Sequence, residues 1–173
     1  MKFTPQSIPD VLLIEPTIHS DGRGYFTETF RQDLFEEAIG YKVNFIQDNE
    51  SKSTKGVLRG LHYQLLPYTQ AKLVRVIEGS VLDVAVDIRK SSPTFGQHVA
   101  VELTAQNKHQ LFAPHGFAHG FVVFSDSATF AYKVDNYYSP NHDRGIAFDD
   151  DQLKIDWQLS AEELQLSDKD KTH

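Results

Sequence analysis

Short runs of β-branched and aromatic residues, separated by clusters of Gly, Pro, Asp and Asn, recur along most of this chain. Runs of this length and composition favour β-strands over helices. We expect strands at 11–15, 24–30, 43–47, 57–64, 72–77, 81–88, 98–103, 110–113, 120–124 and 128–134. Many short strands without long helices between them are typical of an antiparallel all-β protein, and a double-sheet jelly roll accommodates them best.

Local signals add detail to this all-β prediction. Apolar residues alternate with small or acidic ones over 82–88, which predicts a strand with one buried face. The Glu-Gly-Ser sequence at 78–80 predicts the turn of a hairpin before that strand. A short helix is expected at 33–39 with Gly40 as its end, and capping-box spacing at 160–163 predicts another.

Composition limits the size, compartment and partners of the protein. With 173 residues and 40% hydrophobic content, the chain is expected to form one domain over 1–173. It has no signal-peptide pattern and no apolar run near the roughly 20 residues that span a bilayer, so we expect a cytoplasmic protein without a membrane partner. A net charge of −7 disfavours nucleic-acid binding, and the absence of cysteine excludes disulfides and thiolate metal sites.

Four side chains that suit acid–base chemistry lie in or beside the expected strands. Arg59 and His62 stand between apolar residues in the run 57–64, Lys72 begins the next run, and Tyr132 lies inside a later one. Because burial of an unpartnered charge or imidazole is unfavourable, this combination indicates proton transfer. Taken singly, His62 also fits a hydrogen-bonded core histidine, Lys72 an exposed strand-end lysine, and Tyr132 a packed aromatic.

Motifs along the whole chain resemble those of the dTDP-4-dehydrorhamnose 3,5-epimerase family. Each motif alone is weak, but their order and spacing make the set specific. In sequence they are Asp-Gly-Arg-Gly at 21–24, Gln-Asp-Asn at 47–49, Val-Leu-Arg-Gly-Leu-His-Tyr-Gln at 57–64, Asp-Val-Ala-Val-Asp-Ile-Arg at 83–89, Ser-Pro-Thr-Phe-Gly at 92–96, Pro-His-Gly-Phe-Ala-His-Gly-Phe at 114–121, Tyr-Lys at 132–133 and Asn-Tyr-Tyr at 136–138.

The resemblance implies a cupin-type double-stranded β-helix (jelly roll) with short peripheral helices, and a reaction without metal or organic cofactor. The implied reaction inverts C3 and C5 of dTDP-4-dehydro-6-deoxyglucose to give dTDP-4-dehydro-L-rhamnose, a step toward the rhamnose of lipopolysaccharide O-antigen. By the same resemblance His62 is the base, Lys72 stabilises the enolate, Tyr132 is the acid on the opposite face, and Asp170 orients His62. A solvated tail is the alternative for Asp170, because its segment is charged and terminal.

The resemblance also implies contacts to the diphosphate, thymine and sugars of the substrate. Arginines suit the diphosphate, because a guanidinium matches phosphate oxygens, and Tyr138 would stack on the base. The chain is expected to form a homodimer in which N-terminal strands around 11–30 cross to the partner's sheet, so that Arg23 or Glu28 serves the neighbouring site. The implied binding residues are Arg23, Phe26, Glu28, Gln47, Asn49, Arg59, His119, Tyr138, Asp143 and Lys169.

Spacing within the strand at 57–64 makes a further structural prediction. Arg59 and His62 are three residues apart, so they face opposite sides of a regular strand. If both line one pocket, the strand must contain a bulge or bend near Gly60.

Alternatives to this function remain open at the level of sequence. An epimerase that inverts only C3 or only C5 would need the same groups. A metal-dependent cupin would explain the Pro-x-Gly-x-x-His pattern ending at His119, but the earlier motif offers only His62 as a histidine ligand. A non-catalytic sugar-binding cupin is disfavoured by the joint presence of His62, Lys72 and Tyr132.

Overall fold

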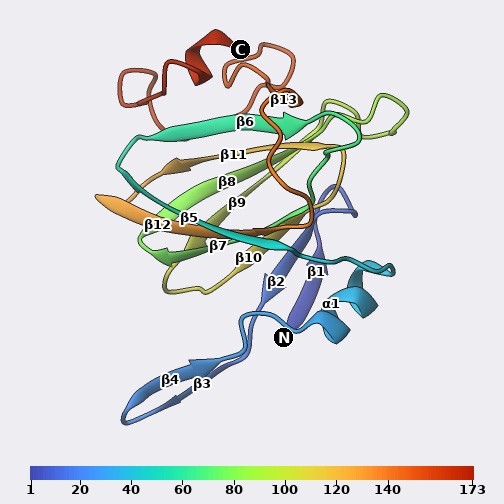
Figure 1. Ribbon diagram of the computed structural model, residues 1–173. Helices are drawn as coiled ribbons and strands as arrows, with labels where there is room; N and C mark the ends of the chain where they lie inside the picture. The colour runs from blue at the N-terminus through green and yellow to red at the C-terminus, as the bar shows by residue number, and fades with distance from the viewer.

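The computed structural model describes residues 1–173, and nearly all of its regular structure is β-strand (Figure 1). The elements in chain order are β1 (Lys2–Pro5), β2 (Leu12–Glu15), β3 (Ile18–Asp21), β4 (Gly24–Thr27), α1 (Gln32–Ile39), β5 (Gln47–Thr54), β6 (Leu58–Gln64), β7 (Lys72–Glu78), β8 (Ser80–Asp87), β9 (His98–Thr104), β10 (Gln110–Ala113), β11 (Phe117–Val123), β12 (Ser127–Val134), β13 (Asp143–Gly145) and the 3-10 helix η1 (Asp170–Thr172).

Two antiparallel sheets form the body of the protein. One has six strands in the order β1-β2-β10-β7-β12-β5, and the other has five in the order β13-β6-β11-β8-β9. Chain neighbours often lie in different sheets: β7 belongs to the first sheet and β8 to the second. This double-sheet arrangement confirms the predicted all-β jelly roll.

The main core lies between the two sheets. Val74, Val76 and Phe130 of the six-stranded sheet pack in one cluster with Val81 and Phe121 of the five-stranded sheet. Each fully buried side chain of this kind contributes about 1.5–3 kcal/mol relative to its exposed state. Interleaved inner-face residues therefore hold the sheets face to face.

The C-terminal segment covers the outer face of the five-stranded sheet, where Figure 1 shows it above β6. Leu82, Val84 and Val86 of β8 pack there with Trp157. The opposite face of β8 turns into the protein, so residues 81–87 are all buried. The expectation that only one face of 82–88 is buried is wrong, because alternation of side chains reports exposure only when one face of the sheet meets solvent.

One of the two expected helices is present. Helix α1 ends at Gly40, whose φ of 80° is left-handed and whose N–H donates to the Glu36 carbonyl. Phe35 of α1 is buried and packs against Leu12, Val43 and other residues of the N-terminal sheet region. At 160–163 one capping-box contact forms, since the Ser160 backbone N–H donates to Glu163 Oε2 at 3.0 Å, but a turn follows instead of a helix.

Several strand predictions differ from the structure. Residues 43–46 are not a strand, and β5 begins only at Gln47. The strand expected at 24–30 ends at Thr27, while β1, β3 and β13 were not predicted. The turn at Gly79 is not a hairpin, because it carries the chain from one sheet to the other. The missed strands β1, β3 and β13 have only three or four residues each, which leaves little apolar periodicity to detect.

The hairpin of β3 and β4 forms a separate two-stranded sheet and projects from the body of the protein (Figure 1). Strand β2, in contrast, pairs with β1 and β10 of its own chain. The expectation that strands across 11–30 leave the sheet is therefore wrong for Leu12–Glu15, and only the hairpin extends away. No helix in this structure combines the length and the apolar character needed to cross a membrane.

Candidate active site

A cavity of about 290 Å³ lies between the sheets at the end covered by the C-terminal segment. Side chains from both sheets line it, so the cavity has walls on two opposite sides. Strands β6 and β11 form one wall, β7 and β12 form the other, and the C-terminal segment closes an edge. The lining residues are Ser51, Arg59, His62, Lys72, His119, Phe121, Phe130, Tyr132, Ser167, Lys169 and Asp170.

A bulge in β6 lets Arg59 and His62 face the same cavity. His119 of β11 lies opposite His62, and Phe121 lies opposite Arg59, so two steps on β11 match three on β6. Gly60 lies within this bulge. Its φ of 124° is a backbone conformation that glycine adopts far more readily than other residues. A Cβ at that position would lie 2.6 Å from the Gly120 Cα, so the strands approach there as only glycine allows. The predicted bulge is confirmed.

His62 forms a close pair with Asp170. His62 Nε2 lies 2.5 Å from Asp170 Oδ1, and Ser167 Oγ donates to Asp170 Oδ2 at 2.8 Å. Asp170 is buried, with 4% of its side chain exposed, which rules out a solvated tail. Burial lowers the pKa of His62, while the charge of Asp170 acts in the opposite direction. His62 is therefore held in a fixed orientation and favours its neutral, basic form.

Lys72 begins β7 and faces the cavity from the opposite sheet. Burial lowers its pKa to about 8, although the carboxylates of Asp83 and Asp143 favour the ammonium. The backbone before it is anchored, because the Ala71 N–H donates to Asp135 Oδ1 at 2.8 Å. The other oxygen of Asp135 lies 2.6 Å from His115 Nε2. Lys72 thus presents a cation at a fixed point in a poorly solvated site.

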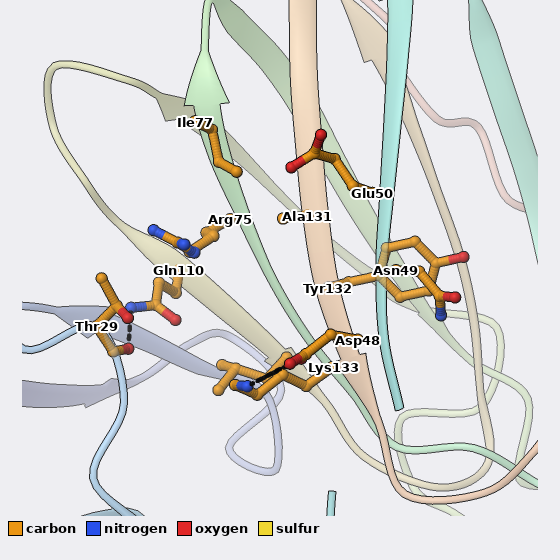
Figure 2. Close-up of a pocket in the computed structure, with 11 residues that line it drawn as sticks. Thr29, Asp48, Asn49, Glu50, Arg75, Ile77, Gln110, Ala131, Tyr132 and Lys133 are labelled. Carbon is orange, nitrogen blue, oxygen red and sulfur yellow. Dashed lines mark hydrogen bonds and ion pairs between the residues drawn. The ribbon is translucent and has the colours of Figure 1, made fainter. Parts of the chain in front are cut away.

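Tyr132 extends the same wall through its pairing with the polar strand β5. Its partner across the strands is Asn49, and Figure 2 shows both side chains on the opposite side of the sheet from Glu50 and Asp48. Gln47 Nε2 donates to Asn49 Oδ1 at 2.7 Å. Burial raises the pKa of the Tyr132 phenol, so its hydroxyl stays protonated and able to donate.

Figure 2 also shows the outer face of this sheet, where a second hollow borders on Asn49 and Tyr132 as well but is otherwise lined by residues that the first cavity lacks. Lys133 Nζ donates to Asp48 Oδ1 at 2.8 Å, and the Gln110 side chain donates to the Thr29 carbonyl at 2.6 Å. The groups with proton-transfer chemistry are on the inner side. Alternation along β5 and β12 separates the two sets.

Tyr138, Asp143 and Lys169 meet beside the cavity. The Tyr138 hydroxyl donates to Asp143 Oδ2 at 3.0 Å, and Lys169 Nζ forms a short contact with the same oxygen. Burial opposes ionisation of Asp143, but the hydrogen bonds from Lys169 and Tyr138 and the charge of Lys169 act together against it and hold the pKa of this carboxyl below its usual value. The cluster joins β13, the segment before it and the C-terminal segment.

His119 is buried against an acidic residue that was not among the predicted site residues. Its Nε2 lies 2.9 Å from Asp83 Oδ2, and Asp83 is completely buried in β8. The sequence placed Asp83 on the exposed side of an amphipathic strand. An acidic residue inside a strongly apolar run was the signal that could have revealed this buried pair.

Three predicted binding residues lie away from the cavity in the isolated chain. Arg23 and Phe26 are on the projecting hairpin, and Glu28 follows it. Arg23 is exposed and donates to Asp21 in the same hairpin. Phe26 is 66% exposed. Nothing within one chain brings these residues to His62.

The fold and the cavity together define a cupin-type β protein equipped for proton transfer, with a paired imidazole, a buried ammonium and a phenol on facing walls. The sequence model of the dTDP-4-dehydrorhamnose 3,5-epimerase family matches residues 5–173. The chain belongs to this family, and it is an isomerase that acts on a carbohydrate.

Individual relatives are similar over nearly the full chain. The chain is 59% identical to a dTDP-4-dehydrorhamnose 3,5-epimerase of Shigella flexneri, covering 98% of this chain and 93% of the relative. It matches the epimerase of Legionella pneumophila in complex with dTDP-4-keto-L-rhamnose with a TM-score of 0.95 and 51% identity, covering 99% and 90%. A 3'-monoepimerase of Streptomyces bikiniensis in complex with dTDP-quinovose is also similar, with a TM-score of 0.89 and 36% identity, covering 97% and 84%.

Proposed function

We propose that the protein inverts C3 and C5 of dTDP-4-dehydro-6-deoxyglucose to give dTDP-4-dehydro-L-rhamnose. The observation that carries this proposal is the opposition of groups across the cavity: His62 with Asp170 on one side, Tyr132 on the other. Inversion at carbon requires removal of a proton from one face and its return on the other. A single base on one wall would only exchange protons.

The proposed chemistry begins at His62. Its Nε2–H donates to Asp170, which leaves the Nδ1 lone pair as the base. The 4-keto group acidifies the hydrogens on C3 and C5, and Nδ1 removes one of them. Lys72 stabilises the resulting enolate oxygen, because a fixed cation in a poorly solvated site acts strongly on developing charge. Tyr132 then donates a proton to the opposite face of the carbon.

The sequence of steps is repeated at the second carbon. It uses only side chains of the protein, and no cofactor enters it. The depressed pKa of His62 keeps the base neutral, and the raised pKa of Tyr132 keeps the acid protonated, so both groups are in the required state near neutral pH.

Binding of the nucleotide is assigned to the polar groups around the cavity. Arg59 supplies a guanidinium for the diphosphate, and His119 and Lys169 line the same space. Gln47 and Asn49 contact the nucleoside, and Tyr138, which is exposed, stacks on thymine with Asp143 fixing its hydroxyl. The whole chain acts as one unit, since the C-terminal segment contributes Asp170 to the site.

A two-fold homodimer completes this binding site. The projecting hairpin reaches the partner's cavity, where Arg23, Phe26 and Glu28 contact the nucleotide. Exposed aromatic residues on the hairpin support this arrangement, since Tyr25 and Phe26 are 58% and 66% exposed in the single chain. The dimer is cytoplasmic. It has no nucleic-acid partner, in keeping with a net charge of −7.

The hairpin assignment is tested with a matched pair of variants. Phe26→Asp should shift the protein toward monomer in light scattering and lower activity. Phe95→Asp, at another phenylalanine that is 54% exposed, should keep the dimer and the activity. A parent protein that is monomeric and fully active would contradict the proposed dimer.

The reaction itself is tested by product analysis. The purified chain is incubated with dTDP-4-dehydro-6-deoxyglucose, and the product is resolved by chromatography and NMR. His62→Asn should bind dTDP as the parent does but turn over about 10²- to 10⁴-fold more slowly. A product inverted at one carbon only would make the protein a monoepimerase, and undiminished turnover by His62→Asn would remove His62 from the mechanism.

A further inference from the structure

His62, Asp170 and His173 bring three metal-binding groups together at one edge of the cavity. Asp170 Oδ1 lies 2.5 Å from His62 Nε2 and 3.8 Å from His173 Nε2, and the donor atoms of all three lie within 4.8 Å of one another. The proposed reaction gives His173 no role, and His173 does not line the cavity. We propose that these three residues form a zinc site, and that a Zn²⁺ ion bound there blocks the epimerase reaction.

His173 is held in place by its surroundings. Its side chain is 14% exposed, and its ring stands edge-on to the His62 ring with centroids 5.9 Å apart. The ring occupies space that exists because residue 145 is glycine: a Cβ on Gly145 would lie 2.1 Å from His173 Cδ2. Gly145 is also the strand partner of His62 across β13 and β6. The pairing of β13 with β6 therefore places the space that the His173 ring fills beside His62.

The donor set suits zinc better than the harder cations. Two imidazole nitrogens and one carboxylate oxygen are ligands that Zn²⁺ prefers, whereas Ca²⁺ and Mg²⁺ require mostly oxygen. Tetrahedral coordination at about 2.0–2.2 Å needs donor atoms about 3.3–3.6 Å apart. The Asp170–His173 separation is already near this value, and the His62–Asp170 hydrogen bond must lengthen as the ion enters. Three protein ligands leave the fourth position for water.

Zinc binding at Nε2 of His62 would prevent this histidine from acting as a base, because it changes which ring nitrogen carries the proton. Neutral His62 carries one ring proton, and in the proposed reaction that proton is on Nε2, which leaves Nδ1 free to accept another. An ion on Nε2 can bind the neutral ring only if the proton moves to Nδ1. No lone pair then remains to abstract a proton from the sugar. This inhibitory step rests on the proposed function, whereas formation of the zinc site does not.

Calorimetric titration of the purified full chain with ZnCl2, without substrate, tests the site directly. His173→Ala and Gly145→Ala should each weaken zinc binding by about tenfold or more, the first by removing a ligand and the second by displacing one. His109→Ala is the matched control, because His109 is another histidine near a carboxylate, 4.0 Å from Glu15, and it should bind zinc as the parent does. Equal zinc affinity of the parent and His173→Ala would overturn the zinc site.

Turnover measured with and without ZnCl2 tests the inhibition. Without zinc, His173→Ala should turn over as the parent does, and added zinc should inhibit the parent at concentrations that leave His173→Ala active. Zinc that binds the parent with His173-dependent affinity but leaves its turnover unchanged would overturn the inhibition. That result would also count against His62 as the base, while loss of zinc binding alone would leave the proposed reaction untouched.

Discussion

His62 Nε2 lies 2.5 Å from Asp170 Oδ1, which joins two residues 108 positions apart in the chain. The contact depends on the C-terminal segment crossing the outer face of the five-stranded sheet, where Trp157 packs on β8. It also depends on the bulge in β6 that turns His62 toward the cavity together with Arg59. A packed terminal segment and a local irregularity thus create the pair that we assign to proton abstraction.

Replacement of Asp170 tests its orienting role. Asp170→Asn removes the charge that favours the imidazolium, so the pKa of His62, already lowered by burial, should fall further. The acid limb of the kcat/KM profile should move to lower pH, while the maximum falls by at least about tenfold because the ring loses its orientation. A lower maximum with an unmoved acid limb would indicate that Asp170 acts only through folding.

Lys72 should determine the pH above which activity falls, that is, the alkaline limb of the pH–activity profile. Burial lowers its pKa to about 8, so the ammonium is present below that pH and lost above it. Activity should therefore fall as pH rises through about 8 in the parent. Lys72→Arg keeps its charge throughout this range, so its residual activity should lack that limb. An identical alkaline limb in both proteins would assign it to another group.

Tyr132→Phe should separate proton removal from inversion. The change deletes the donor oxygen and keeps the ring, so His62 can still abstract a proton and return it to the same face. We expect deuterium exchange from solvent to continue while the formation of inverted product falls by at least about 10²-fold. If this variant inverts the sugar as quickly as the parent, the acid is a different group.

Gly60→Ala tests the bulge that orients His62. The new Cβ would lie 2.6 Å from the Gly120 Cα, at a φ of 124°. The free energy of unfolding in urea should fall by about 2–4 kcal/mol, because backbone strain and overpacking add. Gly96→Ala has a φ of 78° and no atom within 4 Å, so it should lose only about 1 kcal/mol. Equal losses would show that the close approach at Gly60 contributes nothing.

The sequence predicted the fold class and the residues lining the cavity better than the course of individual strands. The alternation of residue types predicted strand β8, yet its acidic residues Asp83 and Asp87 are buried. They are buried because the C-terminal segment covers one face of this strand and the space between the two sheets encloses the other face. Strand β5 is entirely polar, so periodicity gave no signal, although Asn49 and Ser51 face inward from it. Exposure of a strand face depends on elements distant in the chain.

Long-range contacts explain why the sequence pattern did not reveal other parts of the site. The contact of Asp170 with His62 follows from the packing of the C-terminal segment, and only the family resemblance pointed to it. The pair of Asp83 and His119 likewise joins neighbouring strands β8 and β11 that are far apart in sequence. The bulge at Gly60, in contrast, was predictable, because two groups three residues apart cannot face one cavity from a regular strand.

Incorporation of deuterium into the sugar tests proton abstraction and return most directly. The chain is incubated with dTDP-4-dehydro-6-deoxyglucose in deuterated water, and label is assigned to individual carbons by NMR. We predict deuterium at both C3 and C5 of a product inverted at both centres, since every proton returned to carbon comes by way of groups that exchange with solvent. Inverted product without deuterium at either carbon would contradict proton abstraction by His62 and the mechanism built on it.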